Sequence, residues 1–181
     1  MICEASTIEK ITNGAIAAKT LNNWTNRDLW FMPLDDAERG KPRLYTRYHV
    51  IEAVIASRLM RAGLTREMVK SAIEGRCISR ACGLNGGAAW ESDAVDAFKD
   101  LPEFDPNNAE AFWIIAQDRD LEGGVVRQGG VIAVQGAKIL GEKLAEITEI
   151  ACVVLNVSQV IRDINAATEE FNAAVRAADD E

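Results

Sequence analysis

One stretch of this 181-residue chain concentrates side chains that can hydrogen-bond to the edges of DNA bases. Apolar residues at three-residue spacing, Ala18, Leu21 and Trp24, predict a helix over about 17–28 and form its inner face. The outward residues of this helix are Lys19, Thr20, Asn22, Asn23 and Arg27. Asparagine pairs with adenine in the major groove, lysine reaches guanine or phosphate, and threonine contacts base edges or the thymine methyl group. The stretch therefore indicates a helix that reads the major groove of double-stranded DNA.

The composition of this outward face differs from that of an ordinary solvated helix face. Solvated faces consist mostly of glutamate and lysine, whereas this one carries two adjacent asparagines, a threonine and two cations. Asparagine is a poor helix former, so helix propensity alone does not explain the pair. We interpret Asn22 and Asn23 as base-contacting residues.

A basic extended segment follows the predicted helix. Leu29 to Pro33 is an apolar run stopped by proline, residues 35–40 are polar and turn-like, and Pro42 keeps residues 41–45 extended. Two extended runs around a basic tip predict a wing over about 31–45, which suits the phosphate backbone or the minor groove. The wing and the start of the next helix supply the other candidate DNA contacts, Arg39, Lys41, Arg43, Tyr45 and Arg47.

Three further helices are predicted to position the reading helix and the wing. Ile8 and Ile11, three residues apart, predict a short helix before an Asn-Gly turn. Thr46 is expected to cap a helix over about 47–62 that ends at Gly63, and Thr65 is expected to cap a fourth helix. The predicted inward residues of the last two helices are Ile51, Val54, Ile55, Leu59, Ala62, Met68, Val69, Ala72 and Ile73.

In this order, three stretches resemble the DNA-binding domain of the MerR family of transcriptional regulators. They are residues 18–24, where a Thr-Leu pair precedes an aromatic residue, residues 43–46 with His49-Val50, and residues 61–65 with Met68-Val69. In the family, such stretches belong to the recognition helix, the end of the wing and the link into the fourth helix. The resemblance covers about residues 7–75 and implies a winged helix-turn-helix module.

The chain departs from the family pattern at three places. Asn22 stands where the family usually has arginine, and residues 35–38 add an acidic insert to the wing. Gly83 to Gly87 interrupts the chain where the family has a long dimerising helix. Phage excisionases and small terminase subunits carry similar modules, so the module indicates DNA binding but not the biological task.

Charge divides the chain into two unlike halves. Residues 1–80 hold 13 lysines and arginines and 9 acidic residues, a net charge of +4. Residues 81–181 hold 7 lysines and arginines and 19 acidic residues, a net charge of −12. The first half can approach a polyanion and the second half is repelled by one, which indicates two different tasks.

The acidic half is predicted to form a small α/β unit after a linker. The predicted elements are strands at about 112–115, 125–126 and 131–134, a helix over 135–147 and a strand over 151–157 that is covered on both faces. The last predicted helix is capped by Ser158 and ends near Ala177. One face of this helix carries Ile161, Ile164, Phe171 and Ala174. So small a sheet buries itself poorly alone. We therefore expect this half to bind a second copy of the chain or another protein.

The remaining chemically capable residues favour structural roles. His49 is the only histidine and suits packing or capping at the start of its helix, and Cys77 and Cys82 lack the further ligands of a metal site. Asp118, Asp120 and Glu122 suit a solvated acidic loop. The glycine pairs 123–124 and 129–130 lack the Lys-Ser/Thr ending of a phosphate loop and suit turns or bulges. We expect no metal, no cofactor and no enzymatic activity.

The sequence thus predicts an α+β protein with a winged helix-turn-helix at 1–82, a linker at 83–110 and an acidic α/β domain at 111–181 with three or four strands and two helices. No export signal and no membrane-length apolar run are evident, so we expect a cytoplasmic protein with reduced cysteines. The expected function is a sequence-specific transcriptional regulator of bacterial or phage type that binds double-stranded DNA as a homodimer through its C-terminal half.

Two alternatives stay open at this point. An excisionase-like or small-terminase-like protein would use the same module to bring a partner enzyme to DNA. A ligand-sensing regulator would use the α/β half as its sensor, and the sequence does not indicate which small molecule that half would bind.

Overall fold

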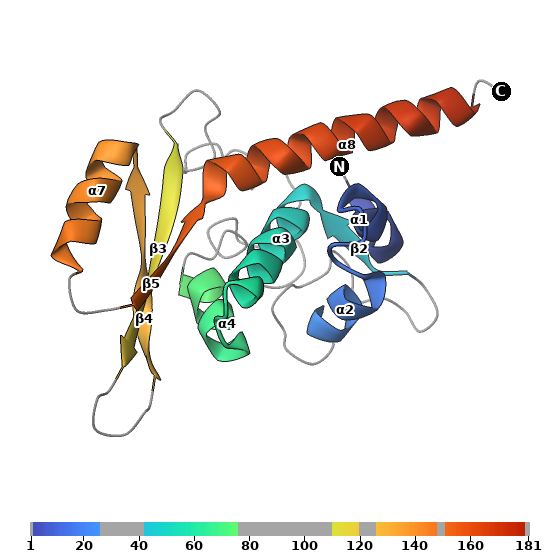
Figure 1. The fold of residues 1–181 in the computed structure, drawn as a ribbon. Coiled ribbons are helices and arrows are strands. Elements are labelled where there is room, and N and C mark those ends of the chain that lie inside the picture. The colour runs from blue at the N-terminus through green and yellow to red at the C-terminus, as the bar shows by residue number, and fades with distance from the viewer. Residues whose placement is uncertain (1, 26–41, 76–109, 120–125, 148–150, 180–181) are drawn as a thin grey trace, which may run out of the picture.

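The computed structural model describes residues 2–25, 42–75, 110–119, 126–147 and 151–179 (Figure 1). These residues form a mixed fold of six helices and two small antiparallel sheets, in agreement with an α+β class. In chain order the elements are β1 (Ile2–Glu4), α1 (Ala5–Ile11), α2 (Ala18–Asn23), β2 (Leu44–Thr46), α3 (Arg47–Arg61), α4 (Arg66–Gly75), β3 (Ala111–Arg119), β4 (Val126–Gln135), α7 (Ala137–Glu146), β5 (Ala151–Asn156) and α8 (Val157–Asp179).

The first sheet joins the start of the chain to the segment that precedes α3. β1 and β2 run antiparallel, with Ile2 opposite Thr46 and Glu4 opposite Leu44. β1 was not predicted from the sequence, because three residues are too few for a strand periodicity to be visible. Only the end of the predicted wing is described, since residues 26–41 lie outside the described ranges.

Local sequence signals predict where both helices after β2 begin and where α3 ends. The Thr46 hydroxyl accepts the backbone N–H of His49, and His49 Nδ1 accepts the backbone N–H of Thr46. Gly63 follows α3 with a φ of +92°, a conformation that glycine adopts at little cost. At the start of α4, the backbone N–H of Met68 donates to the Thr65 hydroxyl. The predicted caps, the predicted helix end and the capping role of His49 are confirmed.

The second sheet has the strand order β4-β3-β5 with antiparallel pairing throughout. β4 is one continuous strand, where the sequence analysis expected two runs separated by glycines 129 and 130. Ile115 lies opposite Val131 and Gln117 lies opposite Gln128, so one residue of β3 faces two residues of β4. The glycine pair is therefore a bulge, which accommodates an extra residue without ending the strand.

β5 lies at an edge of this sheet and one of its faces is partly exposed, so the expectation that it would be covered on both faces is wrong. The sheet lies between α7 on one side and α3 with α4 on the other (Figure 1). Leu155 of β5 faces the core, but its neighbour Val154 is 39% exposed. The reason is that α7 packs on β4, on the opposite edge of the sheet.

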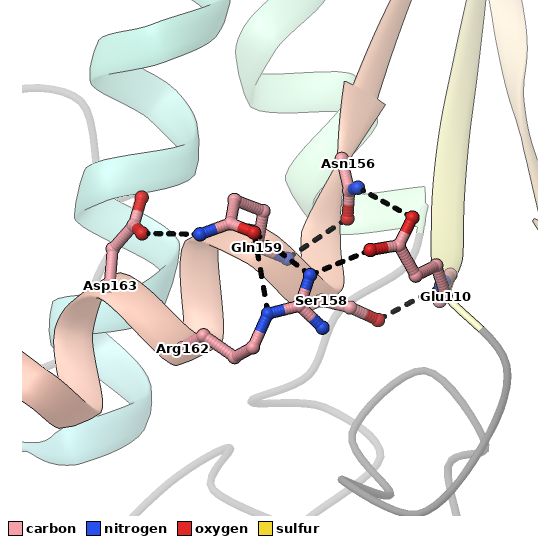
Figure 2. Close-up of polar contacts among 7 residues, drawn as sticks. Glu110, Asn156, Ser158, Gln159, Arg162 and Asp163 are labelled. Carbon is pink, nitrogen blue, oxygen red and sulfur yellow. Dashed lines mark hydrogen bonds and ion pairs between the residues drawn. The ribbon is translucent and has the colours of Figure 1, made fainter.

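α8 begins directly after β5 and is held there by a polar network at the surface (Figure 2). The Asn156 side-chain oxygen accepts the backbone N–H three residues later, so Asn156 caps the helix. The predicted cap, Ser158, lies inside the helix, and its hydroxyl accepts the backbone N–H of Ala111 at the start of β3. Arg162 forms a 2.8 Å ion pair with Glu110. These bonds fix the start of α8 against β3.

The two halves of the chain share one hydrophobic core. α8 packs on α1 and α3, and α4 packs on β4. The second half contributes Trp113, Ile115, Leu155, Val157, Val160, Ile161 and Ile164 to the same cluster as the first half. The predicted domains at 1–82 and 111–181 therefore do not have separate cores.

The residues of α3 and α4 that were predicted to face inward are buried or half-buried, with one exception. Ala62 is exposed, because α3 has ended before it.

Two polar pairs connect α3 to α8 at the edge of this core. Arg47 donates to the side-chain oxygen of Asn165, and Arg58 forms an ion pair with Asp163. Partial burial raises the pKa of the Asp163 carboxyl, but hydrogen bonds from Arg58 and Gln159 and nearby guanidinium charges outweigh this effect. The pKa is therefore lowered from its ordinary value of 3.8.

Replacing Asp163 with asparagine is expected to lower the free energy of unfolding at pH 7 by at most about 1 kcal/mol, because the pair is partly exposed and screened. A carboxyl whose pKa is lowered by folding stabilises the protein above its ordinary pKa of 3.8, and this contribution is lost as the pH falls through the lowered value. The difference between wild type and D163N should therefore shrink as the pH falls below about 4.

Urea denaturation at a series of pH values measures this difference. Glu142→Gln is the matched control, since Glu142 forms a more exposed 3.9 Å pair with Lys138, and its effect should be close to zero. A D163N effect that stays constant down to about pH 2 would contradict a role for the ionised carboxylate.

Candidate nucleic-acid interface

α2 presents a polar face to the surface and an apolar face to the core. Leu21 is fully buried and Trp24, just after the helix, is 5% exposed. Lys19 and Asn23 are exposed and lie four residues apart, so they share one face of the helix, with Thr20 half-buried beside them. The predicted burial of Leu21 and Trp24 and the predicted exposure of Lys19 and Asn23 are thus confirmed. The α-helical part ends at Asn23, Trp24 and Thr25 continue it as a π-helical turn, and Arg27 lies outside the described residues.

A carboxylate from α1 holds the N-terminus of α2. Glu9 Oε2 accepts the backbone N–H of Ala18 at 3.1 Å, and the residue that precedes α2 supplies no capping side chain. The negative charge lies where the free N–H groups and the positive end of the helix dipole are found. Thr12 shapes the turn between the helices, because its hydroxyl donates to the Ile8 carbonyl and accepts the Ile16 backbone N–H. The direction of α2 is therefore set from α1.

Tyr45 ties the C-terminal end of α2 to β2. Its hydroxyl donates to Asn22 Oδ1 at 3.4 Å and lies 3.2 Å from Thr25 Oγ1. Thr25 in turn donates to the Leu21 carbonyl. Tyr45 is fully buried, so the expectation that its side chain contacts DNA is wrong. It is a core residue that orients α2, because its ring packs inside while its hydroxyl reaches polar groups on the helix.

The hydrogen bond from Tyr45 makes Asn22 less available for a base contact than Asn23. Asn22 is half-buried and its amide oxygen accepts from Tyr45, whereas Asn23 is exposed. A side-chain amide pairs with adenine through its oxygen and its nitrogen together. Asn23 is therefore the better placed of the two asparagines for a bidentate base contact.

The predicted wing cations are placed unevenly. Arg47 is exposed at the start of α3 and donates to Asn165 of α8. Arg43 is half-buried, and its Nη1 is enclosed without a hydrogen-bond partner among the residues that the structure describes. Arg39 and Lys41 lie outside those residues, so their contacts stay predictions.

The described parts of the chain were also compared with what a metal site, a disulfide or a membrane span requires. No group of three or more His, Cys, Asp or Glu side chains in these parts is arranged to hold a metal ion. Cys3 and Cys152 are free thiols, and burial raises the pKa of the Cys3 thiol. Cys77 and Cys82 lie outside the described residues. None of the described helices is long and apolar enough to cross a membrane.

No protein-family model and no curated protein sequence matches this chain. The case for α2 as a nucleic-acid contact therefore depends on its exposed side chains and on the residues that hold it.

Sequence reasoning missed Glu9 and assigned Tyr45 to the surface. A signal for Glu9 was present in the sequence. The residue before α2 has no capping side chain, and an acid on the preceding helix can reach the N-terminus of α2 when the turn between the helices reverses the chain. That turn contains Asn13 at φ +48° and Gly14 at φ +74°. No comparable local signal distinguishes a buried tyrosine from an exposed one at the end of a wing.

Replacing Glu9 with alanine is expected to lower the free energy of unfolding by about 0.5–2 kcal/mol, the range for loss of a helix cap. Urea denaturation measures this effect. Glu170→Ala, at an exposed position of α8, is the matched control. An E9A variant as stable as E170A would contradict the capping role.

Proposed function

We propose that this chain is a sequence-specific double-stranded DNA-binding protein of the transcriptional-regulator type, and that it acts as a homodimer. In the proposed complex, α2 lies in the major groove with Lys19, Thr20 and Asn23 toward the bases. The chain from α1 to β2 would then act as a winged helix-turn-helix, with the wing on the phosphate backbone or in the minor groove.

The observation that carries the proposal is the contrast between the two faces of a firmly held α2. Its apolar face is anchored by Leu21, its N-terminus by Glu9 and its C-terminal end by Tyr45. Its outward face carries short polar and cationic side chains, Lys19 and Asn23, rather than acids. A base-reading helix needs both properties, since direct readout requires donors and acceptors held in a fixed direction.

Selection of bound sequences from a random double-stranded DNA pool, with the full chain, tests this proposal. A palindromic motif supports a dimeric regulator, because two copies of one reading helix contact two equal half-sites. A motif without such symmetry would contradict the homodimer. Absence of any enriched motif would contradict sequence-specific reading and would favour an excisionase-like or small-terminase-like role.

The C-terminal half of α8 is the surface that we propose for the homodimer. The helix extends past α1 and α3 (Figure 1), and residues 172–178 are all exposed. Ala174, expected to face inward, lies in this exposed part. Ile164, Phe171 and Val175 are spaced seven and four residues apart, so they continue one apolar side of the helix. Ile164 is 4% exposed in the core, whereas Val175 is 43% exposed. A second copy of α8 would cover the exposed part of this side.

Replacing Val175 with aspartate is expected to weaken the dimer at least tenfold, because a charge at an apolar helix contact must be desolvated. Sedimentation of the full chain over a concentration series measures the change. Ala173→Asp is the matched control, since Ala173 is exposed on the opposite side of α8. A wild-type chain that stays monomeric at high concentration, or a V175D chain that dimerises like A173D, would contradict this interface.

A further inference from the structure

A pocket of about 290 Å³ lies where the turn between α1 and α2 meets α3 and α8. Its apolar lining includes Ile11, Ile16 and Ile164, which come from three different parts of the chain. The volume is at the lower end for ligand pockets in proteins, so it suits a molecule on the order of ten non-hydrogen atoms.

One positive charge at the rim of this pocket is not balanced. Arg58 is paired with Asp163, which cancels those two charges. Arg61 is exposed, and among the described residues it donates one 3.4 Å hydrogen bond, to the Ala15 carbonyl oxygen. No carboxylate in the described ranges pairs with it. A guanidinium has five N–H donors, so most of those on Arg61 remain available to a ligand.

We propose that this pocket binds a small carboxylic acid with a short apolar body. The carboxylate pairs with the planar fork of Arg61, which suits two parallel hydrogen bonds. The apolar body lies against the isoleucines. A free inorganic anion has no apolar group to fill the pocket, and an amine is repelled by Arg61.

The walls of the pocket give such an acid a physical connection to the reading helix. Ala15 and Ile16 belong to the turn that leads directly into α2, while Asp163 and Ile164 belong to α8. A bound acid therefore contacts α8 and the segment that precedes α2 at the same time. If the proposed function holds, on which this step rests, the acid changes DNA affinity, and DNA changes the affinity for the acid by the same factor.

Titration of the full chain with hexanoate, followed by amide NMR, tests the site without DNA. The expected result is saturable shift changes concentrated at residues 12–16, 57–61 and 163–167. Hexanamide, which has the same body without the charge, and the Arg61→Gln variant should each bind at least about tenfold more weakly, the loss expected for a charge-assisted pair. Arg176→Gln, on an exposed position of α8, is the matched control and should bind hexanoate like wild type.

Each outcome separates the pocket from the DNA-binding proposal. Absence of saturable binding, equal binding of hexanamide, or an R61Q variant that binds hexanoate like R176Q would overturn the site. Binding of hexanoate that leaves the affinity for a selected DNA site unchanged would support the site and overturn its role as an effector site. Because the NMR arm contains no DNA, failure to bind DNA does not affect its result.

Discussion

Replacing Ile164 with alanine is expected to lower the free energy of unfolding by about 2–5 kcal/mol, the range for truncation of a buried aliphatic side chain. Ile164 is 4% exposed in the core that both halves of the chain share. It lies on α8, which packs on α1 and α3. Because the core is continuous, the loss should destabilise the N-terminal helices as much as α8, and unfolding should remain one cooperative transition.

Urea denaturation followed by circular dichroism and by tryptophan fluorescence measures both the size and the cooperativity of this effect. Ile139→Ala is the matched control, because Ile139 on α7 is 46% exposed and its truncation should change stability by less than about 0.5 kcal/mol. Two separate transitions, of which only one responds to I164A, would show that the chain folds as two independent domains. An effect no larger than that of I139A would show that α8 does not pack as described.

Replacing Asn23 with alanine is expected to remove about 1–3 kcal/mol of discrimination at one base position, the usual value of a bidentate base contact. Asn23 is exposed on the face of α2 that also carries Lys19. The substitution should leave the fold unchanged, since alanine has a higher helix propensity than asparagine. Binding titrations on the selected DNA site and on its single-base variants measure the discrimination.

Asn172→Ala, an exposed asparagine on α8, is the control for Asn23. Asn172 lies in the part of α8 proposed for dimerisation. Its replacement can therefore lower the affinity for DNA, but by the same factor on every DNA sequence. Base preference should change in N23A alone. If N23A weakens binding equally on all sequences, Asn23 contacts the backbone or acts indirectly, and direct readout by this residue is wrong.

The helices of the first half could be placed from the sequence because their signals are local. The spacing of Leu21 and Trp24 predicts the buried face of α2, and Thr46 and Gly63 predict where α3 begins and ends. Each of these signals acts within one or two helical turns, through side-chain direction, a hydrogen bond to a free backbone N–H, or a positive φ. Such effects act between near neighbours and do not depend on distant segments.

The way in which the elements meet depends on contacts between segments that are distant in the sequence. β1 pairs with β2 across about forty residues of chain. Tyr45 is fully buried, and its hydroxyl reaches Asn22 and Thr25, which lie more than nineteen residues earlier in the chain. One face of β5 stays partly exposed because α7 packs on β4, at the opposite edge of the sheet, which no property of residues 151–156 indicates. One core contains residues from both predicted domains, because apolar faces pack against whichever apolar surface lies near, whatever their separation in sequence.

The candidate DNA-reading helix, α2, depends both on local side-chain spacing and on contacts from distant elements. Its outward residues Lys19 and Asn23 follow from helical spacing alone, and the structure leaves them exposed. Its direction depends on Glu9 and Tyr45, which lie in other elements and reach α2 only when the chain is folded. The side chains that this helix presents could be predicted from the sequence, because side-chain direction is a local property. The contacts that hold the helix could not, because hydrogen bonds between separate elements form only when packing brings those elements together.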